Sequence, residues 1–355
     1  MTLKKELLEI PPALRQMFEE GRPLYDAVIR RVSWGERPIF MVGNGPSYRA
    51  ALSGAWAFET LLGLPVIVQR PAVFSAYTSR ALAVRSLVMA VSGPGDCQET
   101  LQAATKAKKH GAIVCAITAD PASELAQAAD IAVNYGPGGP PDEGTPSVFC
   151  RHAVMLFLAV AAARVLKAPA PLIDAQEEEL GKMAAHVEWV LDQISDAGSA
   201  LAKELGPLPN LYVVGGGPFH PVALEAASRL RQLAGVRASG FELMHFQQEF
   251  RQISQPGAGI LYLSSSRCKL KEQVHQSVRE SRQKDGPKNF VITDGNDRQL
   301  SEHADLAVLL PVLTEAGGAL LALAFLELVT HCAAQASAHG VPRRRQAVKP
   351  PAGTE

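Results

Sequence analysis

Short apolar runs recur along the first half of this 355-residue chain, each ending near glycine, proline or a polar residue. They are rich in valine and isoleucine and do not alternate with polar positions, which is typical of strands buried on both faces of a parallel sheet. The runs cover residues 38–43, 65–69, 86–92, 112–118 and 130–134. Helical patterns at 48–62 and 98–109 and an apolar helix at 149–166 lie between or after them. This alternation predicts a parallel sheet with helices on both faces.

The second half repeats the alternation. Strands are predicted at 210–214, 259–264, 289–293 and 306–310, with a buried helix around 315–334. A proline- and alanine-rich linker (167–172) and a long amphipathic helix (about 173–205) separate the halves. We therefore divide the chain into N-terminal helices (1–35), a first domain (36–168), a linker with a long helix (169–207), a second domain (208–338) and a tail (339–355).

Two segments, 40–48 and 212–220, read as copies of each other. Their glycines and proline, and the alanine and leucine positions that follow up to Gly63 and Gly235, match at one offset of 172 residues. Each copy is an apolar strand, a glycine turn and an amphipathic helix. Such a turn points backbone N–H groups and the positive end of a helix at an anion. The length of the repeat predicts a duplicated α/β domain.

The glycine turns do not fit a dinucleotide site. The third small position of the dinucleotide motif is Tyr48 in one copy and His220 in the other, both too bulky for close packing of helix on strand. The second strand ends at Gln69 and Arg70, without the acidic residue that would hold a ribose. No Gly-Lys-Ser/Thr sequence suggests a nucleoside triphosphate.

The third strand runs into the loop Ser92-Gly93-Pro-Gly95-Asp96-Cys97, and a helix follows. A serine at the tip of a strand, a glycine turn and a helix N-terminus together favour a site for a phosphomonoester. The alternative is that Ser92 and Asp96 only cap the helix. The loop alone does not decide between these interpretations.

Composition narrows the possible functions. Apolar residues make up 47% of the chain, and 35 basic residues balance 35 acidic ones, so no basic surface points to nucleic acid. The five cysteines are widely spaced and no Cys-x-x-Cys occurs, which argues against a zinc ribbon or a disulfide framework. No histidine pair has metal-ligand spacing, and neither a metal nor another cofactor is expected.

The chain is expected to be cytoplasmic. Its N-terminus is charged and does not read as a signal peptide. The longest apolar stretch, 153–165, contains Arg164 and falls short of the ~18 residues that a membrane span needs, so it reads as a buried helix. We expect no membrane partner.

Several separated segments resemble the sugar isomerase (SIS) domain family in the right order, over about residues 36–349. The family's first loop, Cys-Gly-Thr-Ser-Tyr, is similar to residues 44–48, and its phosphate loop, Ser-x-Ser-Gly-x-Thr, to residues 92–97. Its Glu and Val-x-Ser-Thr segment looks like Glu143-Gly-Thr145-Pro-Ser147. Its helix Tyr-Pro-x-Ala-Leu-Glu-x-Ala-x-Lys-Leu-Lys-Glu matches residues 220–232 in spacing, and its ending, Pro-Arg-x-Leu-x-Lys, resembles residues 342–349.

The resemblance implies two tandem domains, each with a five-stranded parallel sheet, similar to the isomerase half of glucosamine-6-phosphate synthase. It also implies a homodimer and a sugar phosphate as ligand. The substrate-binding residues that it implies are Gly45, Ser47, Ser92, Gly93, Gly95, Cys97, Ser147, Arg229 and Gln232. The catalytic residues that it suggests are Glu225, His245 and Lys349.

Departures from the family concern the chemistry. Pro94 and Cys97 replace hydroxyl residues of the phosphate loop, which removes charge-assisted hydrogen bonds. Gln232 stands where the family has a glutamate base, and Arg229 stands where it has a lysine. Because Glu225, Arg229 and Gln232 are spaced i, i+4 and i+7, they share one helix face, on which Glu225 is the carboxylate that could act as base. The alternative is an ordinary Glu225–Arg229 ion pair.

The family's ring-opening histidine has two possible counterparts. Gapless counting places Gln248 there, whereas a three-residue deletion places His245 there. His245 could also be a buried structural histidine, because Met244 and Phe246 flank it. His220 could face the cleft or be solvated, and Lys349 could belong to a disordered charged tail.

These features favour a phosphosugar isomerase or an amino-sugar-phosphate deaminase or deglycase that moves a proton between C1 and C2. In this hypothesis Lys349 and His245 assist Glu225 at O1 or O5. Because the chain begins without the synthase's glutaminase domain, we do not expect it to make ammonia from glutamine. The alternative is a sugar-phosphate-binding or regulatory protein with little or no turnover.

Overall fold

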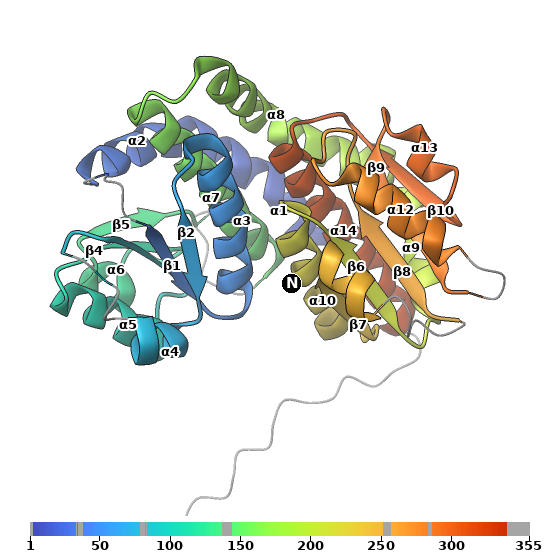
Figure 1. Ribbon diagram of the computed structural model, residues 1–355, viewed down its shortest axis with the longest axis horizontal. Helices are drawn as coiled ribbons and strands as arrows, with labels where there is room; N and C mark the ends of the chain where they lie inside the picture. Colours follow the sequence, from blue (N-terminus) through green and yellow to red (C-terminus); the bar gives the residue numbers. More distant parts are fainter. Residues whose placement is uncertain are drawn as a thin grey trace, which may run out of the picture.

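The computed structural model describes residues 3–32, 34, 38–78, 82, 84–136, 144–250, 257–282 and 286–338. These residues form two five-stranded sheets with strand orders β2-β1-β3-β4-β5 and β10-β9-β8-β6-β7, in which every pairing is parallel (Figure 1). The strands are β1 (Ile39–Gly43), β2 (Val66–Gln69), β3 (Leu87–Val91), β4 (Ile113–Thr118), β5 (Ile131–Asn134), β6 (Leu211–Gly215), β7 (Ala238–Glu242), β8 (Gly259–Leu263), β9 (Lys288–Asp294) and β10 (Leu306–Leu310). The predicted α/β class is confirmed.

Helices surround both sheets. In the first half they are α1 (Leu3–Gln16), η1 (Met17–Gly21), α2 (Arg22–Arg31), α3 (Gly45–Leu62), α4 (Pro71–Val73), η2 (Phe74–Thr78), α5 (Gln98–Lys109), α6 (Glu124–Ala128) and α7 (Thr145–Val165). In the second half they are α8 (Ala170–Gln193), α9 (Ser195–Leu205), α10 (Phe219–Ala234), α11 (Leu243–His245), η4 (Phe246–Phe250), α12 (Lys271–Ser281), α13 (Arg298–Ser301) and α14 (Glu315–Ala338).

The internal repeat is confirmed by backbone geometry. Gly45 and Gly217 occupy equivalent turns with φ of +51° and +55°, in the left-handed region that glycine adopts readily. Helices α3 and α10 then both end at a left-handed glycine, Gly63 and Gly235. Both copies therefore fold as strand, turn and helix.

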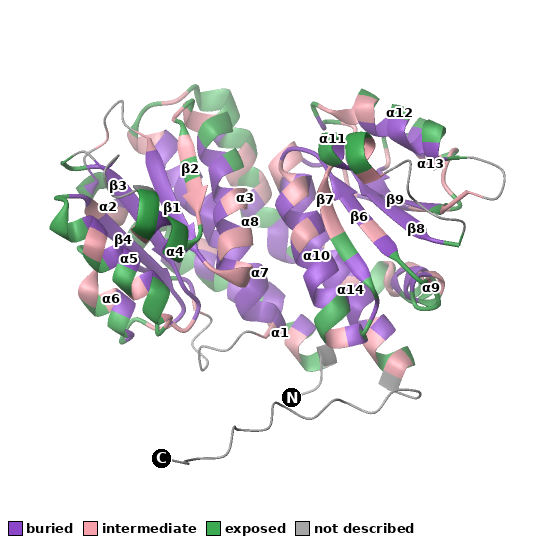
Figure 2. Cartoon of the chain, turned by 60° about the horizontal axis from the view of Figure 1, so that its bottom comes forward, coloured by how far each residue is buried: buried purple, intermediate pink, exposed green. Residues whose placement is uncertain are grey.

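The two halves share one apolar core. Helix α3 packs on α7, α10 packs on α14, and α3 and α10 also contact each other, so the duplicated helices lie at the junction of the halves. A single buried cluster runs from Met41 through Leu158 to Leu323. Figure 2 shows the buried strands of both sheets with exposed residues concentrated on the outer helices. The amino-terminal helix α1 contacts α7, α8 and α14 and therefore bridges the halves.

Some element boundaries differ from those predicted. The long helix at 173–205 is two helices, because the chain turns at Ile194 (φ −122°, ψ 23°), and α8 begins at Ala170, inside the predicted linker. Strand β7 was not predicted, since Ala-Ser-Gly-Phe-Glu is polar and forms a half-exposed sheet edge. A Cβ at Gly240 would lie 2.7 Å from the backbone oxygen of Ala223, so glycine allows β7 to pack closely on α10.

Helices α7 and α14 are long and apolar enough to cross a membrane by length and composition alone. In each of them 89% of the apolar window is buried inside the fold. Such burial is typical of a core helix. Helix α7 begins at Thr145, four residues earlier than predicted, which places Ser147 in its first turn.

Candidate functional site

Three helix N-termini lie close together in the first half, beyond the carboxyl ends of β1 and β3. Helix α3 follows β1 directly, and its N-cap residue Asn44 donates a side-chain hydrogen bond to Glu99 in the first turn of α5. Arg151 of α7 donates to Ser47 in the first turn of α3. Because the N-terminus of a helix carries partial positive charge and backbone donors, this arrangement favours an anion. We call this region, the first turns of α3, α5 and α7 with the loop 92–97, the anion cradle.

The loop 92–97 has a tightly determined backbone. Ser92 is buried, and its Oγ accepts a hydrogen bond from the N–H of Gly95 at 3.2 Å. Gly95 has φ +72°, and a Cβ there would lie 2.2 Å from Oγ of Ser123. The N-cap residue of α5 is Cys97, whose side chain makes no capping hydrogen bond, and the bond described for Ser92 goes to Gly95 and not to α5. The serine bonds within the loop instead.

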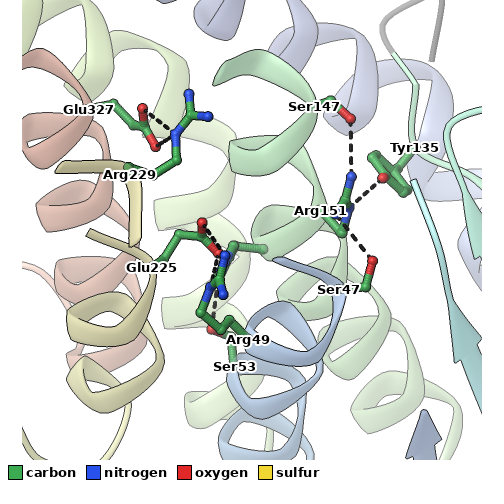
Figure 3. A network of polar contacts seen from close by, with 10 residues as sticks. Ser47, Arg49, Ser53, Tyr135, Ser147, Arg151, Glu225, Arg229 and Glu327 are labelled. Atoms are coloured by element: carbon green, nitrogen blue, oxygen red, sulfur yellow. Dashed lines mark hydrogen bonds and ion pairs between the residues drawn. The ribbon is translucent and has the colours of Figure 1, made fainter. Parts of the chain in front are cut away.

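Arg151 lies behind the cradle and was not singled out from the sequence. Its side chain is fully buried and donates from Nε to Oη of Tyr135 at 2.7 Å, from Nη1 to Oγ of Ser47 at 3.1 Å and from Nη2 to Oγ of Ser147 at 3.4 Å (Figure 3). Ser47 and Ser147 are each the third residue of their helix and each follows a proline. The signal in the sequence was a charged residue inside the apolar run 149–166.

Glu225 pairs across the two halves and not along its own helix. Its carboxylate accepts from Nε of Arg49 at 2.7 Å and from Nη2 at 3.0 Å, and it is fully buried (Figure 3). The alternative of a Glu225–Arg229 pair is wrong, because Arg229 pairs with Glu327 at 3.0 Å and donates to Oγ1 of Thr145 at 2.6 Å.

Buried hydrogen bonds keep Glu225 ionised. Burial alone would raise the pKa of Glu225, but hydrogen bonds from His152 and Arg49 outweigh it and lower this pKa to about 2. His152 Nε2 lies 3.5 Å from the carboxylate, and its Nδ1 lies 2.8 Å from Oγ of Ser53. Burial lowers the pKa of His152, so this imidazole is neutral near pH 7. The group is an interdomain ion pair with both carboxylate oxygens bonded.

The remaining candidates lie elsewhere. Gln232 is exposed near the end of α10, and Gln248 is exposed within η4. The interpretation of His245 as a buried histidine is wrong: its side chain is 51% exposed, it lies 3.1 Å from Glu249, and its ring contacts Phe250. Within one chain the described contacts of His245 therefore do not bring it to Glu225. Lys349 lies outside the described residues, as does Glu143.

His220 is half-buried at the start of α10, and burial lowers its pKa. The nearby carboxylate of Glu242 opposes that shift. His220 is therefore not fully solvated, which was one of the two alternatives for this residue.

Carboxylates from neighbouring elements, Asp294 at the end of β9 and Glu315 at the start of α14, bond to the equivalent loop of the second half. This loop follows β8, and Oδ2 of Asp294 accepts from the backbone N–H of Ser266 at 2.8 Å and from its Oγ at 2.9 Å. Oε1 of Glu315 accepts from the N–H of Lys269 at 3.1 Å, just before α12 begins. Side chains of the protein itself therefore bond to the donors at this loop.

Residues 34–164 match the model of the SIS domain. The second half repeats the same strand order, so the fold of the chain matches two such domains in tandem.

Among known proteins, the chain is similar to the glutamine–fructose-6-phosphate aminotransferase (isomerizing) of Mycolicibacterium paratuberculosis, with 29% identity over 363 residues. The match covers 97% of this chain and 57% of that relative, so the chain spans little more than half of its length.

Two solved structures share the fold. The C-terminal domain of glucosamine-fructose-6-phosphate aminotransferase from Francisella tularensis has a TM-score of 0.80 and 18% identity, and the match covers 93% of this chain and 94% of that one. Tagatose-6-phosphate ketose/aldose isomerase from Escherichia coli has a TM-score of 0.78 and 14% identity, with 94% and 93% covered. At these identities the likeness is one of fold.

Proposed function

We propose that this protein binds a sugar phosphate with the phosphate in the anion cradle, and that it acts as a phosphosugar isomerase or an amino-sugar-phosphate deaminase or deglycase. The observation that carries the proposal is the meeting of the α3, α5 and α7 N-termini around two serines that Arg151 holds. The SIS domain match over residues 34–164 and the isomerizing relative support the same class of substrate.

In the proposed reaction a ring-opened sugar phosphate loses and regains a proton between C1 and C2. Gln232 cannot serve as the base, because an amide does not accept a proton near neutral pH. Glu225 is the carboxylate that the resemblance places on this face, and both of its oxygens are bonded to Arg49. It could accept a proton from substrate only after leaving Arg49. His245 and Lys349 complete the proposed set at O1 or O5, and the exposure of His245 would allow a second subunit of the proposed homodimer to reach it.

A second candidate is a sugar-phosphate-binding protein without turnover. The engaged carboxylate of Glu225 favours it specifically, because a carboxylate whose pKa is about 2 is a weak base at pH 7. In that case the cradle would bind the ligand and the interdomain pair would be structural.

Proton NMR in D₂O separates the two candidates. The protein is mixed with fructose-6-phosphate, glucosamine-6-phosphate, tagatose-6-phosphate or a fructosamine-6-phosphate. Deuterium at C1 or C2, or release of the amine, is the expected result for the enzyme and names its substrate class. Line broadening without exchange would indicate a binding protein, and no effect with any compound would contradict the phosphate site.

The same experiment with Glu225→Gln tests the proposed base. If this variant binds the sugar phosphate normally but no longer exchanges the proton, Glu225 is the base. If it exchanges the proton at the wild-type rate, Glu225 is not the base.

Cys97 offers a direct reporter of the cradle. It is a half-buried free thiol at the N-cap of α5, and Cys332, also half-buried and free, serves as an internal control in α14. At ten times the Kd of fructose-6-phosphate about a tenth of the sites are free, so alkylation of Cys97 by iodoacetamide should slow about tenfold while that of Cys332 is unchanged. Peptide mass spectrometry measures both rates. Equal rates for Cys97 with and without bound ligand would place the phosphate elsewhere.

A further inference from the structure

We propose that Arg151 is a positioning residue for the phosphate: it fixes the hydroxyl groups of Ser47 and Ser147 so that both donate into the anion cradle. The inference rests on the proposed phosphate site. The inference goes further because it assigns a role to Arg151, a buried residue of α7 whose side chain donates hydrogen bonds to both serines. Arg151 is not proposed to touch the substrate.

The first step of the argument is the direction of the hydrogen bonds. A guanidinium group has five N–H donors and no acceptor, whereas a serine hydroxyl has one donor and two acceptor positions. Toward Arg151 the oxygens of Ser47 and Ser147 can therefore only accept, at 3.1 and 3.4 Å. The hydroxyl proton of each serine then points to another acceptor. A phosphate oxygen in the cradle would be such an acceptor.

The second step is the fixed orientation of the guanidinium plane. Its Nε donates to Oη of Tyr135 at 2.7 Å, and Tyr135 is itself buried. The planar fork of arginine can hold three oxygens in one geometry, which the single ammonium of lysine cannot reproduce. Tyr135 on one side thus fixes the direction in which Nη1 and Nη2 meet the serines.

The third step concerns charge and symmetry. Arg151 is fully buried, so its positive charge acts on the cradle with less screening than a surface charge would. Ser47 and Ser147 occupy the same third position in helices that begin Gly-Pro-Ser and Thr-Pro-Ser. One cation therefore sits behind matching serines on two helix N-termini, and its field adds to that of the helices.

The test measures binding of inorganic phosphate and of fructose-6-phosphate by titration calorimetry. Ser47→Ala and Ser147→Ala should each weaken binding about tenfold, because each removes one donor to a charged acceptor. Arg151→Met should weaken it about 100-fold, since both serines lose their orientation and the charge is lost. Arg164→Met is the matched control on the same helix: Arg164 pairs with Asp26 and Glu177, and its loss should leave phosphate affinity unchanged.

A double-mutant cycle separates positioning from general support of the fold. If Arg151 acts through the serines, Arg151→Met in a Ser47→Ala/Ser147→Ala background should weaken binding much less than it does in the wild type. A purely structural role would give the same loss in both backgrounds. Thermal denaturation of each variant checks folding. If Arg151→Met does not fold, Arg151→Lys takes its place and should still bind at least about tenfold more weakly than the wild type.

The outcomes distinguish the inference from the proposed function. Wild-type protein that binds neither probe would overturn the phosphate site and the role of Arg151 with it. Wild-type binding together with unchanged affinity in Arg151→Met, or in Arg151→Lys where that variant is used, would overturn the role of Arg151 and leave the site intact. If Arg151→Met reduced phosphate affinity equally in the wild type and in the Ser47→Ala/Ser147→Ala background, the positioning role of Arg151 would also be overturned.

Discussion

Replacing Gly95 with alanine is expected to weaken fructose-6-phosphate binding by at least about 100-fold. Two effects combine at this residue. A left-handed backbone costs an alanine roughly 1–2 kcal/mol, and its Cβ would lie 2.2 Å from Oγ of Ser123. Because Ser123 caps α6 and bonds to the backbone oxygen of Asp120, it has little room to withdraw. The loop 92–97 must therefore shift in the variant, and the hydrogen bond from the N–H of residue 95 to Oγ of Ser92 is lost.

Gly63→Ala provides the matched control for this experiment. Gly63 has φ +65°, but nothing lies within 4 Å of the position that its Cβ would take. It should therefore lower stability by the backbone strain alone, about 1 kcal/mol, and leave binding unchanged. Titration calorimetry measures affinity and thermal denaturation measures stability. Equal affinities in the two variants would show that the loop 92–97 does not hold the phosphate.

The second large effect is expected at the interdomain ion pair. Glu225→Gln should lower the free energy of unfolding by about 3 kcal/mol at pH 7, because removing one partner leaves the charge of Arg49 without its carboxylate. The same magnitude follows from the pKa of Glu225, which falls from 4.5 to about 2 on folding. Urea denaturation followed by circular dichroism measures the difference between the two proteins.

The stability difference between the wild type and Glu225→Gln should depend on pH in a defined direction. A carboxyl group whose pKa is lowered in the folded state stabilises the protein above its unfolded pKa, and that contribution is lost as pH falls through the folded pKa. The difference between wild type and Glu225→Gln should therefore be full above about pH 4.5 and shrink toward pH 2. Glu178→Gln is the control, because Glu178 forms an exposed pair with Lys182 and its loss should change stability little at any pH. A difference that did not change with pH would contradict the ion pair.

The sequence predicted the class of fold and the placement of the glycine turns because both depend on local signals. Continuous apolar runs indicated the central strands, and the paired glycines indicated turns whose φ values are indeed positive. Strand β7 was missed because an edge strand needs no buried apolar run. The break at Ile194 was missed because neither glycine nor proline marks it.

The candidate site was less predictable because its side chains meet through tertiary contacts. Helical spacing correctly brought Glu225 and Arg229 onto one face, but their partners, Arg49 and Glu327, are 176 and 98 residues away. Nothing in a single helix distinguishes such partners from a pair at i and i+4. Arg151 left a clearer trace, since a charge inside an apolar helix requires buried acceptors. The predicted roles of Glu225, His245 and Lys349 await the exchange experiment.

The carboxylates in the second half bear on how many ligands one chain can hold. Asp294 and Glu315 bond to the donors of the loop that corresponds to the cradle. A carboxylate that belongs to the same chain has a high effective concentration at the loop. A free phosphate would have to match that effective concentration and displace a group of the same charge in order to bind there. We therefore expect saturation at one equivalent of sugar phosphate per chain. The two halves of the chain thus have the same arrangement of strands, turns and helices, but in the second half carboxylates of the protein itself accept hydrogen bonds from the loop after β8.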